Sequence, residues 1–295
     1  MKPTEVSSLD DPALSCFKAL RDRDLRVEFG AYIVESPRVV RRFLRAVARG
    51  PYEARGVLLT PEHCTDLSDE LAGLPEDVPV FVAPLEVMIE LSGYRFHAGA
   101  LAIGERPDRS PSLEDLLEHL PAKGSLTLLI AEGVSNMDNI GAILRDAAAF
   151  GVDGVHFGEG CSDPLLRKAI RVSMGRVFNV EWAMCNDIEH AIQRLASEAG
   201  IQSIALENLP TATPLGDMVW HDRTAIVVGN EGHGLRQTTI DACAAATRIP
   251  SPADLPVDEQ AGGSDELSLN VSVATAIALY ARTATPSPLV RERDL

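Results

Sequence analysis

The chain of 295 residues has no apolar run close to the roughly 18–20 residues that a membrane-spanning helix requires. Residues 1–12 lack the apolar core of a signal peptide, so secretion is not expected. The five cysteines are scattered, odd in number and without a C-x-x-C pair. This pattern indicates reduced thiols rather than disulfides or zinc ligands. We therefore expect a cytoplasmic protein that contacts no membrane and holds no metal.

Aromatic residues are also few, at 5% of the chain, but hydrophobic residues make up 45%. The latter fraction is that of an ordinary globular protein and excludes a disordered or fibrous one. A chain of this length can form two domains, each with its own core.

Positive charge is scarce, because 27 Lys and Arg stand against 43 Asp and Glu. Nucleic-acid binding normally requires basic surface, so most of this chain is poorly suited to it. Residues 1–50 are the exception, with ten basic and seven acidic residues. Arginines follow a helical spacing between positions 38 and 49 and so share one face, which is either a solvated charged face or a phosphate-contacting one. The candidate contact residues are Arg38, Arg41, Arg42 and Arg45.

The first half of the chain has the pattern of a small α/β unit. We expect strands at residues 31–36, 54–60, 78–84 and 99–104, and helices at residues 14–25, 37–49, 61–74 and 86–93. For the helix at 37–49, Ser36 is the expected N-cap, Pro37 the first residue and Gly50 the stop. A polar, proline-containing stretch follows at 105–112. We place a first domain at 1–106, a linker at 107–121 and a second domain at 122–295.

The second half alternates short apolar runs with helical stretches. This alternation predicts right-handed crossovers and a parallel sheet covered on both faces. Ligands of such sheets bind beyond the carboxyl ends of the strands. Three blocks of residues fall at those ends, at 136–151, 227–235 and 249–280.

The first block contains Asn139, ahead of a helix expected to begin near Gly141, and Arg145 within that helix. Taken alone, Asn139 is explained as an N-cap and Arg145 as a surface ion-pairing residue. The helix is otherwise apolar and rich in alanine. A lone arginine in it therefore either points away from the core or is held in a site.

The second block, G-N-E-G-H-G-L at 229–235, follows an apolar strand and precedes a helix. Three glycines in six residues fit a turn whose backbone N–H groups face a ligand, although a plain strand–helix turn would also explain them. The spacing is not G-x-G-x-x-G, and no Lys-Ser/Thr pair follows, so neither a nicotinamide cofactor nor a P-loop is supported. Glu231 is the only acid in the turn.

The third block ends a strand at Ile249 and Pro250 and opens an apolar terminal helix after Ser268 and Asn270. Capping alone would explain either polar residue. The 17 residues between Pro250 and Ser268 are acidic and contain two adjacent glycines.

In this order the three blocks resemble the SpoU (TrmH-like) RNA 2′-O-ribose methyltransferases of the SPOUT class, over residues 122–282. Residues 11–106 resemble the small RNA-substrate-binding domain of ribosomal-RNA members. The resemblance implies methyl transfer from S-adenosylmethionine to a ribose 2′-hydroxyl of RNA, ribosomal RNA rather than tRNA because of the N-terminal domain. It also implies a C-terminal α/β domain with a trefoil knot and a homodimer formed through the terminal helix. The family pattern assigns catalytic roles to Asn139, Arg145, Glu231, Ser268 and Asn270, and cofactor contacts to Gly229, Ile249 and Leu269.

Several alternatives stay open at this stage. A knotted relative could methylate a base nitrogen or a tRNA ribose, although the pair Asn139 and Arg145 favours ribose. An RNA-binding or assembly factor could keep the fold without activity, which the acidic charge favours and the intact Arg145, Glu231 and Asn270 disfavour.

Overall fold

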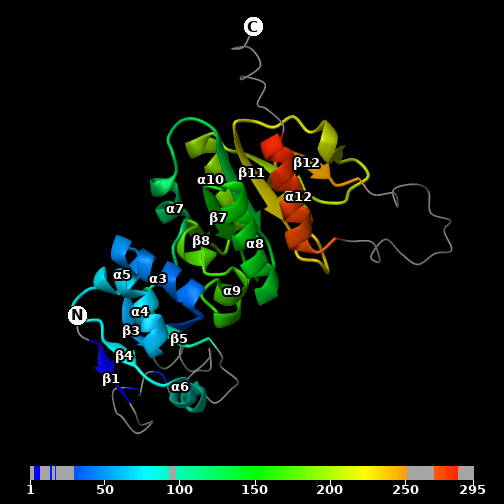
Figure 1. Ribbon diagram of the computed structural model, residues 1–295. Coiled ribbons are helices and arrows are strands. Elements are labelled where there is room, and N and C mark those ends of the chain that lie inside the picture. Colours follow the sequence, from blue (N-terminus) through cyan, green and yellow to red (C-terminus); the bar gives the residue numbers. More distant parts are fainter. Residues whose placement is uncertain are drawn as a thin grey trace, which may run out of the picture. The chain divides into compact units, whose positions relative to one another are not determined.

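A computed structural model of the chain describes residues 3–6, 14, 17, 30–92, 98–250 and 269–284. The chain divides into two compact units, drawn in Figure 1 with sequence colouring. Unit 1 takes Met1–Arg109 and Asp163–Asn179, and unit 2 takes Ser110–Ser162 and Val180–Leu295. The chain therefore passes between the units three times. The domain boundaries at 106 and 121 stay a prediction. Most of the helix expected at 14–25 lies outside the described residues.

Five strands form the sheet of unit 1, in the order β1-β4-β3-β5-β2. β4 is parallel to β1 and β3, whereas β5 is antiparallel to β3 and β2. All five residues of β2 are buried, so both faces of this edge strand are covered. The strands are β1 (Thr4–Glu5), β2 (Ala31–Glu35), β3 (Ala54–Leu59), β4 (Val80–Val82) and β5 (Ala100–Glu105).

The helix α3 (Pro37–Arg49) places its apolar residues in the core of unit 1 and its arginines on the other side. Pro37 is its first residue and Gly50 ends it in a left-handed conformation, as predicted. Ser36 occupies the predicted N-cap position, but its φ is 82° and its side chain makes no capping hydrogen bond. The other helices from the first half are α4 (Pro61–Asp66), α5 (Ser68–Ala72) and α6 (Leu85–Ser92), so the helix expected at 61–74 is interrupted at Leu67.

Two short elements from the second half of the chain also belong to unit 1. They are the helix α9 (Arg167–Val172) and the 3-10 helix η2 (Arg176–Phe178). α9 packs against β2, and η2 packs against α3. The ring of Phe178 lies 5.1 Å from that of Phe43 and 5.2 Å from that of Tyr52, centroid to centroid. Residues 163–179 therefore complete the core of unit 1.

Seven strands form the sheet of unit 2, in the order β10-β12-β9-β11-β6-β7-β8, and every pairing is parallel. The predicted fold class, an α/β chain with a parallel sheet in its second half, is confirmed. The trefoil knot stays a prediction. The strands are β6 (Leu126–Ala131), β7 (Gly154–Phe157), β8 (Trp182–Met184), β9 (Gln202–Leu206), β10 (Thr213–Pro214), β11 (Arg223–Val228) and β12 (Ala245–Arg248).

Helices accompany the strands of unit 2. They are α7 (Leu113–His119), α8 (Met137–Phe150), α10 (Ile188–Ala199), α11 (Gln237–Ala242) and α12 (Val271–Ala284), with a 3-10 turn η3 (Leu215–Asp217). α8 and α12, 120 residues apart in sequence and coloured green and red, pack side by side (Figure 1). α10 contributes Ile188, Ile192 and Leu195 to a core shared with β6, β9 and β11. Within the described part of the chain, no helix is both long and apolar enough to cross a bilayer.

Candidate functional site

The carboxyl ends of β6 and β11 meet at the centre of the unit 2 sheet. The N–H of Glu132, just after β6, donates to the carbonyl oxygen of Val228 over 2.8 Å. Gly133, whose φ of 67° favours glycine, faces Asn230, and a Cβ added to it would lie 2.9 Å from Nδ2 of that side chain. The parallel pairing thus brings the first two sequence blocks together at one edge of the sheet.

Asn139, Glu231 and Asn270, one residue from each block, form a single hydrogen-bonded cluster. Nδ2 of Asn139 donates to Oε1 of Glu231. Nδ2 of Asn270 donates to the same oxygen over 3.1 Å and to Oδ1 of Asn139 over 3.0 Å. Asn139 is 6% exposed, whereas Glu231 and Asn270 are exposed. The cluster therefore presents two side chains to solvent over a buried amide that fixes them.

The local structure of α8 differs from the prediction in one respect. The helix begins at Met137, and its N-cap is Asn136, whose side chain accepts from the N–H of Asp138. Asn139 therefore lies in the first turn rather than ahead of the helix, and it does not cap it. In α12, by contrast, Oδ1 of Asn270 accepts from the N–H of Ser272 over 3.0 Å, so Asn270 caps its helix as well as joining the cluster.

Arg145 is not part of this cluster. It is exposed, and among the described residues no hydrogen bond or ion pair joins it to Asn139, Glu231 or Asn270. The reason is helix geometry, since six residues of α-helix turn a side chain to about 120° from Asn139 around the axis. Its neighbour Asp146 lies seven residues from Asn139, and burial raises the pKa of the Asp146 carboxyl to about 6, opposed by the charge of Arg145.

The turn at 229–235 folds back on itself at very short range. The N–H of Gly234 donates to the carbonyl oxygen of Asn230 over 3.0 Å, and Oδ1 of Asn230 accepts from the N–H groups of Gly232 and His233. A Cβ added to Gly229 would lie 2.2 Å from the carbonyl carbon of Gly234. Glycine is therefore required at 229 by the close approach of two backbone segments.

Two carboxylates that sequence reasoning missed hold the end of this turn. Oε2 of Glu207, just after β9, accepts from the N–H of Leu235 over 2.8 Å. Oε2 of Glu132 accepts from the N–H of Arg236 over 2.9 Å, and its Oε1 accepts from Nε of Arg236 and the hydroxyl of Thr239. The bond from the Arg236 side chain to Glu132, helped by the charges of the nearby carboxylates, raises the pKa of Arg236. The available signal was an acid directly after the last residue of an apolar run, in LLIAEG and SIALEN.

The remaining predicted site residues of unit 2 are Ile249, Leu269 and Ser268. Ile249, after β12, is partly exposed, and Leu269, next to Asn270, is 45% exposed. Both are apolar side chains not fully covered by protein. Ser268 lies outside the described residues. Within those residues, no group of three His, Cys, Asp or Glu is placed to hold a metal ion.

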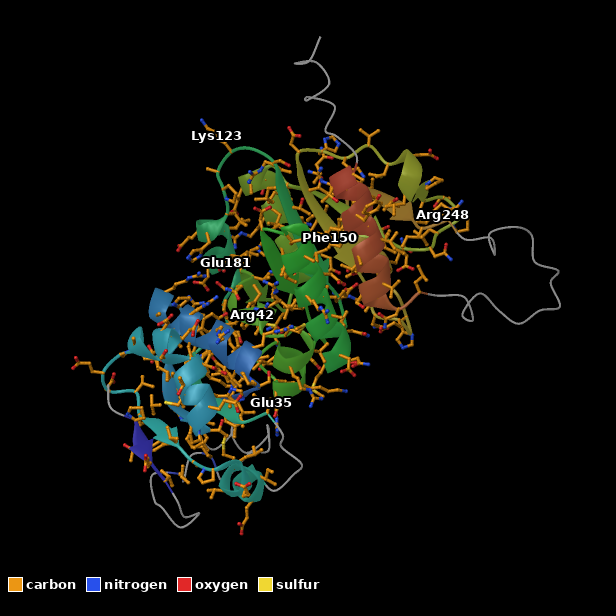
Figure 2. The ribbon with its side chains drawn as sticks, in the orientation of Figure 1. Glu35, Arg42, Lys123, Phe150, Glu181 and Arg248 are labelled. Atoms are coloured by element: carbon orange, nitrogen blue, oxygen red, sulfur yellow. The ribbon has the colours of Figure 1, made fainter. Side chains whose placement is uncertain are left out.

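The arginines of α3 lie in unit 1 and differ in their partners. Arg41 and Arg45 lie 3.5 and 2.8 Å from the Glu70 carboxylate, and Arg41 also donates to the carbonyl oxygen of Asp66. Arg42, labelled in Figure 2, donates through Nη1 to the carbonyl oxygen of Met174. Arg38 is exposed.

The model of the SpoU rRNA methylase family matches residues 126–280, which include all three blocks. An uncharacterized tRNA/rRNA methyltransferase of Mycobacterium bovis is 33% identical over 286 residues, covering 95% of this chain and 91% of that protein. A 23S rRNA (guanosine-2′-O-)-methyltransferase of a Burkholderia species is 33% identical over 190 residues, covering 64% of this chain and 71% of that protein.

Solved structures show the same fold. An rRNA methyltransferase from Sinorhizobium meliloti matches with a TM-score of 0.76 and 22% identity, over 97% of this chain and all of that one. An AdoMet-bound rRNA methyltransferase from the same organism matches with a TM-score of 0.74 and 22% identity, over 96% and 99% of the two chains. The resemblance seen in the three blocks is thereby confirmed, and the chain belongs to the SpoU rRNA methylase family.

Proposed function

We propose that this enzyme methylates a ribose 2′-hydroxyl of ribosomal RNA. The observation that carries the proposal is the convergence of Asn139, Glu231 and Asn270 at the carboxyl ends of β6 and β11. The similarity to a 23S rRNA (guanosine-2′-O-)-methyltransferase supports ribosomal RNA over tRNA and ribose over a base nitrogen.

The three clustered side chains are suited to orienting a hydroxyl. Asn139 and Asn270 both donate to Glu231, so the carboxylate is fixed by two amides before any substrate arrives. Among the described residues, Oε2 of Glu231 accepts no hydrogen bond and so stays available to a polar group, whereas Asn270 donates both N–H groups within the cluster and accepts from Ser272. Preorganised hydrogen-bonding groups of this kind align the attacking oxygen and cost no reorganisation when the reaction occurs.

Arg145 is proposed to act on the substrate's phosphate and on the 2′-oxygen. A guanidinium is a poor base, because it keeps its proton at any ordinary pH. It can instead hold the phosphate and stabilise the negative charge that develops on the 2′-oxygen as the proton leaves. Its exposure on α8, away from the cluster, leaves it accessible to RNA.

The residues around the turn fit an adenosyl cofactor. S-adenosylmethionine supplies a methyl group already activated on a sulfonium. Gly229 brings backbone to the sheet edge where no Cβ has room, and Ile249 and Leu269 offer uncovered apolar side chains for an aromatic ring. We propose these three residues, with Ser268, which lies outside the described residues, as the residues that hold cofactor and substrate.

A homodimer through α12 is supported by an exposed apolar stripe on that helix. Val273, Ile277 and Tyr280 follow each other at spacings of four and three, and they are 47%, 36% and 65% exposed. A surface of this kind on a terminal helix is typical of a subunit interface. Replacing Ile277 by Asp is expected to give monomers in sedimentation velocity, whereas Ser272→Asp, on the same helix but off the stripe, is expected to leave dimers.

Other features are proposed on the family resemblance. They are the knotted C-terminal segment, the division into an RNA-binding domain at 1–106, a linker at 107–121 and a methyltransferase domain at 122–295, and action in the cytoplasm. The α3 arginines Arg38, Arg41, Arg42 and Arg45 are proposed as the RNA-facing surface of the first domain.

Transfer of labelled methyl groups to unmodified 23S rRNA and to tRNA tests the proposal. The wild type is expected to give label in rRNA that resists alkaline hydrolysis, since a methylated 2′-oxygen cannot attack the neighbouring phosphate. Arg145→Ala is expected to lose transfer and retain cofactor binding. Label that is alkali-labile would show base methylation, and unchanged transfer by Arg145→Ala would remove that residue from the mechanism.

A further inference from the structure

The segment Asp163–Asn179 is basic in an acidic protein. It carries four basic residues and one acidic residue, whereas the whole chain has a net charge of −16. It packs within unit 1, against the elements β2 and α3. Its charge therefore adds to that of the α3 arginines, from which it is more than 100 positions away in sequence.

The contact between this segment and α3 is close and specific. Nη1 of Arg42 donates to the carbonyl oxygen of Met174. A Cβ added to Gly175 would lie 3.1 Å from Cγ1 of Val39 and 3.5 Å from Cβ of Arg42, so the backbone of the turn rests directly on the helix. Gly175 has a φ of 76°, which glycine adopts without strain. Arg176 follows this turn at once and so begins beside Arg42.

Helix geometry adds a third guanidinium to the pair. Arg38 precedes Arg42 by four residues on α3, so the two side chains lie one above the other on one face. Arg38, Arg42 and Arg176 thus come together from two segments of unit 1. Burial lowers the pKa of Arg42, and the charges of Arg176, Arg38 and Arg45 lower it further, as expected where like charges gather.

Ion pairing separates these three arginines from their neighbours. Glu70 pairs with Arg41 and Arg45, and Glu35, labelled in Figure 2, pairs with Arg167 and Arg171. Among the described residues of the chain, no carboxylate forms an ion pair with Arg38, Arg42 or Arg176. Among the described residues, the surface therefore holds three positive charges without a paired carboxylate, beside two groups in each of which two arginines share one carboxylate.

We infer that Arg38, Arg42 and Arg176 form a composite phosphate-docking cluster for the backbone of the RNA substrate. The inference rests on the proposed function and deepens it, because it replaces a stripe along α3 by a cluster shared with residues 163–179. Guanidinium groups bind phosphate oxygens through paired N–H donors, and release of counterions from RNA makes such contacts favourable and salt-dependent. Arg41 and Arg45 contribute less, because an RNA phosphate must compete with Glu70 for them.

Binding of an unmodified 23S rRNA transcript to the full-length enzyme, measured by filter binding from 50 to 300 mM KCl, tests the cluster. The test variant is Arg38→Gln/Arg176→Gln, which spares Arg42 and its bond to Met174. The matched control is Arg41→Gln/Arg45→Gln, which removes two charges from the same unit. The test variant is expected to bind roughly tenfold more weakly at 150 mM KCl and to lower the slope of log Kd against log salt by about 1.4–1.8. The control is expected to change both quantities less.

A charge-preserving variant and a measurement of methyl transfer separate failure of the cluster from failure of the proposed function. Arg38→Lys/Arg176→Lys is expected to keep most of the salt slope, since it keeps the charge. The phosphate-docking cluster would be overturned if the control variant weakened RNA binding as much as the test variant, or if the test variant kept the wild-type salt slope. The proposed function would still stand in that case, provided that the wild type methylates the transcript. A wild type that neither binds nor methylates the transcript would overturn both.

Discussion

Two regions of this molecule bring together residues that lie almost equally far apart in sequence. In unit 2, Asn270 donates to Asn139 across 131 positions. In unit 1, Arg42 donates to Met174 across 132 positions. The first contact joins two residues that the sequence nominated for one site. The second joins a helix of the first half of the chain to a segment that lies between two of the methyltransferase blocks.

The difference lies in what fixes each contact. A parallel sheet collects the carboxyl ends of its strands at one edge, so residues that follow β6 and β11 meet whatever the details of the side chains. No comparable rule places residues 163–179. Their apolar residues could cover either unit, and the choice depends on the shape of the core into which Phe178 fits. Topology is thus readable from local patterns, whereas the packing partner of a short amphipathic segment is not.

Of the changes predicted for the two units, removing the ring of Phe178 is expected to have the largest effect, a loss of stability in unit 1. The ring is 5% exposed and contacts the rings of Tyr32, Phe43 and Tyr52. Phe178→Ala leaves a cavity among them and should lower the free energy of unfolding by about 3–5 kcal/mol. Hydrogen exchange is expected to speed up in β2 and α3 of unit 1 more than in β6 and β11 of unit 2.

Ile192→Ala in α10 is the matched control, because Ile192 lies in the unit 2 core. It should loosen β6 and β11 and leave β2 and α3 protected. If Phe178→Ala instead loosened the unit 2 sheet first, residues 163–179 would belong energetically to the methyltransferase blocks.

The sequence predicts most of the clustered residues of the candidate site, but not the residues that hold the turn beside them. Asn139, Glu231 and Asn270 were predictable, because each follows a strand end or opens a helix in a recognisable block. The start of α8 was misplaced, since Asn136 and Asn139 are both able to cap and only the backbone distinguishes them. Glu132 and Glu207 were missed, because the sequence shows that each acid follows a strand but not which backbone N–H group of the turn it accepts from.

The next largest effect is expected in unit 2, where substitution of Glu231 should slow methyl transfer. Glu231→Ala leaves both amides of the cluster without their shared acceptor, and about 100-fold slower methyl transfer is expected from the lost alignment. Glu231→Gln keeps an acceptor oxygen, so its rate of methyl transfer should fall less. Single-turnover transfer and the KM for RNA separate the steps, since a loss of alignment lowers the rate and leaves KM nearly constant. An equal loss in both variants would show that the charge, not the geometry, matters.

A smaller and pH-dependent effect is expected from His156 in β7. The side chain is fully buried, neither ring nitrogen has a hydrogen-bond partner among the described residues, and burial lowers its pKa to about 4, opposed by Glu114. The unfolded chain, with an ordinary pKa of about 6.5, then binds more protons than the native one between these values. Stability is therefore full above pH 6.5 and is lost as pH falls, by about 1.2 kcal/mol between pH 7 and 5.5. Urea unfolding of wild type and His156→Leu at both pH values measures it, and an equal pH dependence in the two proteins would exclude His156 as its source.

The smallest effect is expected from substitution of Tyr52, which helps to attach residues 163–179 to the rest of unit 1. Its hydroxyl donates to the carbonyl oxygen of Val177 over 2.9 Å, so Tyr52→Phe removes one hydrogen bond and keeps the ring contact with Phe178. A loss of about 1 kcal/mol in the free energy of unfolding is expected. The ring of Phe178 contributes several times more to the free energy of unfolding than this hydrogen bond does. The double variant Tyr52→Phe/Phe178→Ala should therefore lose less stability than the sum of the two single losses. Additive losses would mean that the hydrogen bond holds the segment independently of the aromatic contact, and attachment at two separate points would then replace the single core described for unit 1.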